Sequence, residues 1–266
     1  MDIFQAVVIA IIEGFTEFLP ISSTGHMAVT SSIMGIEKDA FTKLFEIVIQ
    51  FGAILSVLVV YRKKFFDFRR PSFYIKLILA IIPALIFGAL FKNSIASILE
   101  RPLIIALVML GGGILLLFVD KWFDHPTTGQ EEQVTTRQAF NIGMYQVLAI
   151  LLPGLSRSAA TIIGGMQQKL TRTEAAEFSF FLAVPTMLAA TVKSLYDVYQ
   201  KTPEVLNTSS ISTLLLGSVI AFIIALLTIR FLIGWLQKHG FRAFGWYRIA
   251  LSCLLLVLIA SGYLHT

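Results

Sequence analysis

The chain has 266 residues, of which 56% are hydrophobic and only 14% are charged. Soluble domains carry about a quarter charged residues, so this composition excludes an ordinary soluble domain and indicates an integral membrane protein. The single cysteine, Cys253, excludes a disulfide framework and a cysteine-based metal site. The formal net charge of +5 comes from basic residues between the apolar runs. We interpret these residues as topology signals, and we expect no nucleic-acid partner.

Two short apolar segments open the chain. The first, 3–19, carries two acids and stops at Pro20, and the second, 27–34, is shorter still. A spanning helix needs about 20 mainly apolar residues, so we expect a re-entrant helix–loop–helix unit instead. Such a turn at membrane depth is tolerated only inside the protein or beside water. No basic segment precedes the first run, so no signal peptide is expected.

Six later runs are long enough to cross the membrane, and a second short pair lies between the third and fourth of them. The crossing runs are 44–61, 75–91, 103–119, 175–198, 211–236 and 246–264, and the second re-entrant pair is 138–152 with 158–166. We therefore predict an all-α polytopic membrane protein with six transmembrane helices and two re-entrant units, forming a single domain over 1–266.

The second short pair repeats the first at a constant offset of 133 residues. The aligned pairs include Gln5 with Gln138, Glu13 with Gln146, Pro20 with Pro153, and Ser23 with Ser156. Three crossings separate the two units, so they enter from opposite faces and their turns converge. This predicts an inverted-topology repeat of residues 1–119 and 138–266, with its site near the membrane midplane.

Basic residues orient the chain, because they gather in cytoplasmic loops. They crowd the segments before the second and the last crossing, and include Arg62, Lys63, Lys64, Arg69, Arg70, Lys76, Lys238, Arg242 and Arg248. Segment 121–137 falls on the same side, although its acids, Asp120, Asp124, Glu131 and Glu132, outnumber its bases. Both termini are then expected outside.

The first turn follows two acids on one helix face, Glu13 and Glu17, which are four residues apart. Two like charges within a bilayer are unfavourable unless a cation lies between them. Carboxylate oxygens, completed by water and phosphate, suit Mg²⁺ or Ca²⁺. The alternatives are that Glu13 reaches an interface or that one acid is protonated.

Hydroxyl residues follow Pro20. One of Ser22, Ser23 and Thr24 is expected to cap the second half-helix, whose free N–H groups also suit an anion. His26 lies three residues after Ser23, and is either a general acid or base, a nucleophile, or a packed structural side chain.

The second turn supplies Gly154, Ser156, Arg157, Ser158 and Thr161. Gly154 permits a tight turn, and Ser156 is expected to cap the following half-helix. Arginine is costly at membrane depth and binds phosphate through its planar fork, although a structural pairing with Glu17 is the alternative. A cation at one turn and a guanidinium at the other favour a phosphate or diphosphate ligand.

Weaker signals lie outside the turns. Glu46, Gln50 and Glu177 begin the helices after the two units, where they either support the site or favour the helix dipole. Gly111, Gly112 and Gly113 indicate close helix packing.

Together these motifs resemble the bacterial undecaprenyl-pyrophosphate phosphatases, or bacitracin-resistance proteins. The matching segments are Glu13-x-x-x-Glu17, S-S-T-G-H at 22–26, F-E-I-V-I-Q at 45–50, P-G-x-S-R-S-x-x-T at 153–161 and E-F-S-F at 177–180. The resemblance covers essentially the whole chain. It implies a multi-pass plasma-membrane enzyme that removes the terminal phosphate of undecaprenyl diphosphate, recycles the lipid carrier and confers bacitracin resistance. It also implies a divalent cation and a site on the outer side.

On this basis we expect phosphoryl transfer between the two turns. The expected catalytic residues are Glu17, Ser23, His26 and Arg157; the expected substrate-binding residues are Ser22, Thr24, Gly154, Ser156, Ser158 and Thr161; and the expected metal ligands are Glu13 and Glu17. Ser23 as nucleophile with His26 as base is slightly preferred over His26 as nucleophile, and attack by activated water stays open.

A lipid carrier or transporter is the main rival function, because broken helices at the midplane also suit transport. A non-catalytic scaffold is a weaker rival. The sequence leaves homodimerisation, polyprenyl length and product flipping open.

Overall fold

The computed structural model describes residues 1–99, 101–123 and 134–262. Within these ranges the regular secondary structure is helical throughout. The elements are α1 Ile3–Thr16, α2 Ser23–Ile33, α3 Ala40–Val60, α4 Arg62–Phe65, α5 Pro71–Leu90, α6 Lys92–Leu99, α7 Pro102–Trp122, α8 Thr136–Leu151, α9 Arg157–Gln167, α10 Arg172–Lys201, the short 3₁₀ helix η1 Pro203–Val205, α11 Thr208–Lys238 and α12 Arg242–Ala260.

Six of the described helices, α3, α5, α7, α10, α11 and α12, are long and apolar enough to cross a membrane. They coincide with the six predicted runs, so the all-α multi-pass class is confirmed. The short helices α4 and α6 were not predicted. The last two residues of the run 246–264 lie outside the described residues, as do the loop acids Asp124, Glu131 and Glu132.

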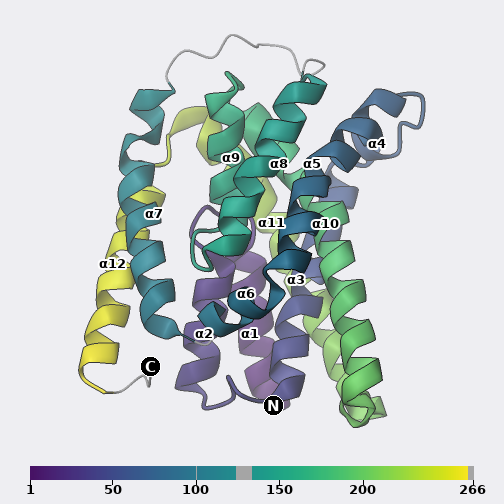
Figure 1. The fold of residues 1–266 in the computed structure, drawn as a ribbon, viewed down its shortest axis with the longest axis vertical. Helices are drawn as coiled ribbons and strands as arrows, with labels where there is room; N and C mark the ends of the chain where they lie inside the picture. Colours follow the sequence, from purple (N-terminus) through teal and green to yellow (C-terminus); the bar gives the residue numbers. More distant parts are fainter. Residues whose placement is uncertain (100, 124–133, 263–266) are drawn as a thin grey trace.

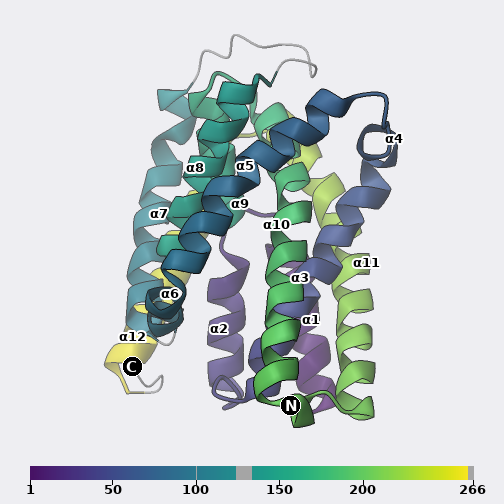
Figure 2. The ribbon, with the colours of Figure 1, turned by 45° about the vertical axis from the view of Figure 1, so that its right-hand side comes forward.

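The two short helix pairs lie among the long helices (Figure 1), and α1 and α8 each keep an exposed apolar face, with Phe15 and Phe140 on the surface. The pair α1–α2 fills the lower half of the bundle and the pair α8–α9 the upper half, and their turns meet between them (Figures 1 and 2). α1 packs along α11, α8 packs along α5, and α7 packs against α12. The N-terminus and the end of α12 lie at one end of the bundle, and α4 lies at the other.

Glycine brings both short helices against the backbone of a long neighbour. A Cβ atom on Gly14 of α1 would lie 2.8 Å from the Ala221 carbonyl oxygen of α11, and one on Gly143 of α8 would lie 2.1 Å from the Ala80 carbonyl oxygen of α5. In both pairs a glycine therefore allows the short helix to pack closely against a long helix, and a larger residue at that position would prevent this contact.

A buried guanidinium joins the two turns. Arg248 of α12 is fully buried, and it donates to the carbonyl oxygens of Pro20 at 3.3 Å, Leu155 at 2.8 Å and Gly154 at 3.0 Å. A fourth bond, 3.2 Å long, reaches Met109 of α7. The interpretation of Arg248 as a cytoplasmic loop charge is therefore wrong, since it lies inside α12 and serves the turns. Lys76 likewise lies in α5, not in the loop before it.

Room for this guanidinium comes from the glycine stretch of α7. A Cβ atom on Gly112 would lie 2.2 Å from Nη2 of Arg248, and one on Gly113 would lie 3.1 Å from the Gly245 carbonyl oxygen. The predicted packing role of these two glycines is confirmed, whereas Gly111 faces open space.

Arg248→Met should strongly destabilise the protein, because it leaves four buried carbonyls without their donor. Each unsatisfied buried group costs about 1–3 kcal/mol, so we expect the Tm in detergent to fall by about 10 °C. Arg248→Lys keeps the charge but offers one nitrogen, and should give an intermediate Tm. Arg242→Gln, at an exposed site on the same helix, is the matched control. A Tm of Arg248→Met equal to that of the control would show that the guanidinium does not hold the turns.

Candidate active site

Each turn ends in a serine that caps the following half-helix. Ser22 adopts φ 72° and its hydroxyl accepts from the Gly25 N–H at 3.2 Å; Ser156 adopts φ 77° and accepts from the Ala159 N–H at 3.3 Å. Positive φ is uncommon outside glycine, so the shared geometry marks two equivalent turns. The predicted caps are confirmed.

This equivalence corrects the sequence alignment by one residue. The preceding helices keep the offset of 133, since the capping boxes of α1 and α8 use Asp2 with Gln5 and Thr135 with Gln138. The second turn is one residue longer, so Ser22 corresponds to Ser156. Ser23 then corresponds to Arg157, and each is the first residue of its half-helix.

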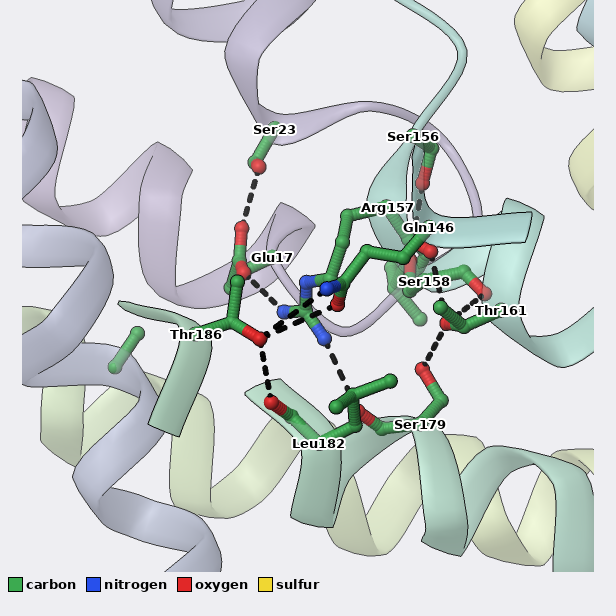
Figure 3. Close-up of polar contacts among 12 residues, drawn as sticks. Glu17, Ser23, Gln146, Ser156, Arg157, Ser158, Thr161, Ser179, Leu182 and Thr186 are labelled. Carbon is green, nitrogen blue, oxygen red and sulfur yellow. Dashed lines mark hydrogen bonds and ion pairs between the residues drawn. The ribbon is translucent and has the colours of Figure 1, made fainter. Parts of the chain in front are cut away.

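Glu17 connects the two turns through its carboxylate (Figure 3). One oxygen, Oε2, accepts from the Ser23 hydroxyl at 2.6 Å, and the other forms an ion pair with Nη2 of Arg157. The second arm of the Arg157 fork, Nη1, donates to the Ser179 carbonyl at 3.2 Å. The Glu17 and Arg157 side chains are only 5% and 10% exposed. The structure thus brings three of the four expected catalytic residues into contact, and the direct Glu17–Arg157 pairing is present.

Glu13 lies one turn before Glu17, fully buried, and neither of its carboxylate oxygens has a hydrogen-bond partner among the described residues. Oε1 of Glu46 is also buried without a partner there. A buried carboxylate without donors fits a hard divalent cation. The described residues contain no group of three or more His, Cys, Asp or Glu able to hold a metal. A cation at Glu13 would therefore take most of its ligands from water and a phosphate.

His26 faces away from Ser23. Its Nδ1 lies 2.7 Å from the Ser22 carbonyl and its Nε2 lies 2.8 Å from the Tyr247 hydroxyl. These partners assign the proton to Nδ1 and leave Nε2 to accept from Tyr247. The hydrogen bond expected between His26 and Ser23 is absent, and Glu17 takes that place. Tyr247 carried no sequence signal, because its position beside His26 depends on the packing of α12.

The hydroxyl residues of α9 hold the turns together. The Ser158 hydroxyl donates to the Leu19 carbonyl of the first turn at 3.0 Å and lies 3.0 Å from the Ser156 hydroxyl. The Thr161 hydroxyl donates to the Arg157 carbonyl at 2.8 Å and lies 2.6 Å from the Ser179 hydroxyl of α10. Ser158 therefore joins the two turns and Thr161 fixes the first turn of α9, while contact with substrate stays a prediction for both.

The remaining candidates lie around this contact. Thr24 is half-buried beside Ser23, and Gly154 adopts φ 99° with no room for a Cβ, which would lie 2.7 Å from the Ile105 carbonyl oxygen. Gln146, the counterpart of Glu13, is fully buried and its amide lies 3.3 Å from the Thr186 hydroxyl. Sequence reasoning gave no role to Ser179, although it lies in the matching segment E-F-S-F at 177–180, and it gave none to Thr186, which belongs to no matching segment. Glu177 pairs instead with Lys64, at 2.9 Å.

Known proteins share this sequence along nearly its whole length. Residues 6–254 match the family described as bacitracin resistance protein BacA. Relatives named undecaprenyl-diphosphatase include one from Flavobacterium psychrophilum, 53% identical over 97% of this chain and 96% of the relative, and one from Flavobacterium johnsoniae, 52% identical over 97% and 96%. Another, from Porphyromonas gingivalis, is 50% identical over 98% of both chains. The chain therefore belongs to the bacitracin resistance protein BacA family.

Proposed function

We propose that this protein hydrolyses undecaprenyl diphosphate to undecaprenyl phosphate and inorganic phosphate where its two turns meet. The single observation that carries the proposal is the contact of Glu17 with both Ser23 and Arg157, which joins a base, a hydroxyl and an anion clamp. Relatives 50–53% identical over nearly the full length bear the name undecaprenyl-diphosphatase. The reaction recycles the lipid carrier for cell-wall synthesis and lowers the pool of diphosphate that bacitracin sequesters.

The arrangement supports a two-step displacement. The Ser23 hydroxyl oxygen attacks the terminal phosphorus and gives its proton to Glu17, which accepts from it at 2.6 Å. The bond from that phosphorus to the bridging oxygen breaks, and undecaprenyl phosphate leaves with the electron pair. Water then attacks the phosphorus of the phosphoserine, the bond from phosphorus to the serine oxygen breaks, Glu17 returns its proton to that oxygen, and inorganic phosphate leaves.

Charge on the transferred phosphoryl group is met from both turns. Arg157 would exchange its contact with Glu17 for the phosphate oxygens, and α2 and α9 both begin at the turns, where helix N-termini favour an anion. His26 has no covalent role here, because its Nε2 is held by Tyr247. The contact of an acid, a hydroxyl and a guanidinium favours catalysis over a transport function, which would need no nucleophile.

Glu13 and Glu17 would hold a divalent cation, Mg²⁺ or Ca²⁺, on the diphosphate side of the site. When bound, that ion would neutralise charge on the phosphate oxygens. Support comes from the two Glu13 oxygens, which are buried without hydrogen-bond partners among the described residues.

We also propose that the helix pairs are re-entrant units of an inverted repeat in a single domain, with the site open to the outer face of a bacterial plasma membrane. The packing of α1 on α11 and of α8 on α5, and the matching serine caps, support the repeat. The basic α4 end supports a cytoplasmic location for that end. The polyprenyl chain would lie in the bilayer. Both turns come from one chain, so the reaction needs no homodimer.

Replacing members of the central contact should strongly lower turnover without unfolding the protein. Ser23→Ala should lower kcat at least about 1,000-fold through loss of the nucleophile. Arg157→Lys should lower it about 100-fold, because an ammonium cannot replace the planar fork. Phosphate release from undecaprenyl diphosphate in detergent measures both. Ser31→Ala, a buried hydroxyl on the same α2 helix, is the control and should stay within about twofold of wild type.

Acid-quench trapping with terminally labelled substrate separates the possible nucleophiles. Serine attack gives an acid-stable label that Ser23→Ala removes and His26→Ala retains. An acid-labile label would assign the attack to histidine, and turnover without any label would assign it to water; either result overturns the serine step.

A chelator should abolish the activity, and added Mg²⁺ or Ca²⁺ should restore it. Glu13→Gln should raise the metal concentration for half-maximal activity at least about tenfold, because an amide oxygen binds the ion more weakly than a carboxylate. Glu174→Gln, remote from the turns, is the matched acid-to-amide control. Identical metal titrations for Glu13→Gln and wild type would remove Glu13 from the ligand set.

Cysteine labelling tests the orientation. In a Cys253→Ser background, a membrane-impermeant maleimide applied to intact bacterial spheroplasts should label Lys38→Cys and spare Lys63→Cys. Both positions are exposed, at opposite ends of the bundle. After the membrane is permeabilised, both should react. The reverse pattern in intact spheroplasts would place the α4 end outside.

A further inference from the structure

A cavity of about 420 Å³ lies at the α4 end of the bundle, far along the chain from both turns. It is lined by α4, the segment leading into α5, the first turns of α5, and the start of α10. Figure 2 shows the start of α5 and the start of α10 at the same end of the molecule. None of the expected site residues lines this cavity.

The rim of the cavity carries an excess of positive charge. Lys64, Arg69, Arg70 and Lys76 line it. Lys64 is paired with Glu177 at 2.9 Å and Arg70 with Asp67 at 3.1 Å. The side chains of Arg69 and Lys76 make no ion pair or hydrogen bond with any described residue. Arg69 and Lys76 are therefore two positive charges that no anion among the described residues pairs with.

The acids of the cavity are already engaged, so they do not cancel this charge. Glu177 is the partner of Lys64, and Glu174 accepts from the Thr171 N–H at 2.8 Å in the capping box of α10.

The floor of the cavity is aromatic. Phe178 and Phe181 of α10 are each 5% exposed and line it beside Phe73 of α5. The rings of Phe73 and Phe181 pack edge to face, with centroids 5.2 Å apart. A basic rim above an aromatic floor suits an amphiphile, whose phosphate meets the cations and whose first acyl carbons cover the rings.

The cavity lies at the ends of two candidate membrane spans. It opens where α5 begins at Pro71 and α10 begins at Arg172, and both helices are candidate membrane spans. Basic pockets between spanning helices at this level are suited to anionic phospholipid head groups. We propose that this cavity binds the phosphate head group of an anionic membrane phospholipid, with Arg69 and Lys76 as its free cations.

Titration of the detergent-purified protein with phosphatidylglycerol, followed by native mass spectrometry, tests the proposal. The double variant Arg69→Gln/Lys76→Gln should weaken binding at least tenfold. The control Arg62→Gln/Lys63→Gln removes the same charge from exposed residues at the same end, which line a neighbouring cavity, and should stay within twofold of wild type. An unchanged Tm shows that each variant is folded. Equal losses in the two double variants would overturn the proposal in favour of diffuse attraction to anionic lipid.

Competition experiments separate a lipid from a soluble phosphate. Deacylated glycerophosphoglycerol and inorganic phosphate should displace phosphatidylglycerol only at concentrations at least a hundredfold higher, because they leave the aromatic floor uncovered. Phosphatidylcholine, which has no net charge, should not displace it. Displacement by inorganic phosphate at the same concentration as the lipid would overturn the proposal and assign the rim to a soluble anion.

Discussion

The fold depends on satisfying the backbone carbonyls where two helices stop inside the bundle. A helix that ends at membrane depth leaves carbonyl oxygens without donors, and no water is at hand to supply them. Arg248 donates hydrogen bonds to carbonyl oxygens of both turns, namely those of Pro20, Gly154 and Leu155. Its acceptors there are neutral carbonyls of the turns that follow α1 and α8, so one buried charge gives hydrogen-bond donors to both turns. The helices α2 and α9 begin at these two turns. Their positive N-terminal ends therefore lie beside the candidate site, where they favour the binding of an anion.

The two turns and the helices that follow them have the same backbone arrangement, but they carry different side chains at equivalent positions. Ser23 and Arg157 each begin a half-helix after a serine cap, and Glu13 corresponds to Gln146. This arrangement brings the two first residues to the same carboxylate, Glu17, one as hydroxyl donor and one as ion-pair partner. In the proposed repeat, the two turns thus share their backbone geometry and differ in the side chains that they present to Glu17. A second acid at position 146 would add another buried charge, which the neutral Gln146 avoids by pairing with Thr186.

Local features were predictable from the sequence, and contacts across the fold were not. The length of the apolar runs predicted all six candidate spans, and cap chemistry predicted Ser156 because it depends on neighbouring residues alone. Arg248 was misread as a loop charge because its acceptors lie 93 to 228 residues away along the chain. His26 was expected to serve Ser23, but Tyr247, which packs in from α12, takes its Nε2. The extra residue in the second turn was hidden because the aligned serines, Ser23 and Ser156, match by identity although their backbone roles differ.

The ion pair of Glu17 and Arg157 would couple the proposed binding of the substrate to the proposed binding of a cation. In this structure Arg157 is committed to Glu17 and Ser179, so a phosphate that claims its fork must displace the carboxylate. Glu17 would then lose its positive partner. Its side chain is only 5% exposed, so a carboxylate left there without a partner would be costly. Glu13, fully buried one turn away, offers two more oxygens without donors among the described residues. If Glu13 and Glu17 hold a divalent cation as proposed, its charge would compensate for the loss of Arg157, and cation and substrate would then each favour the binding of the other.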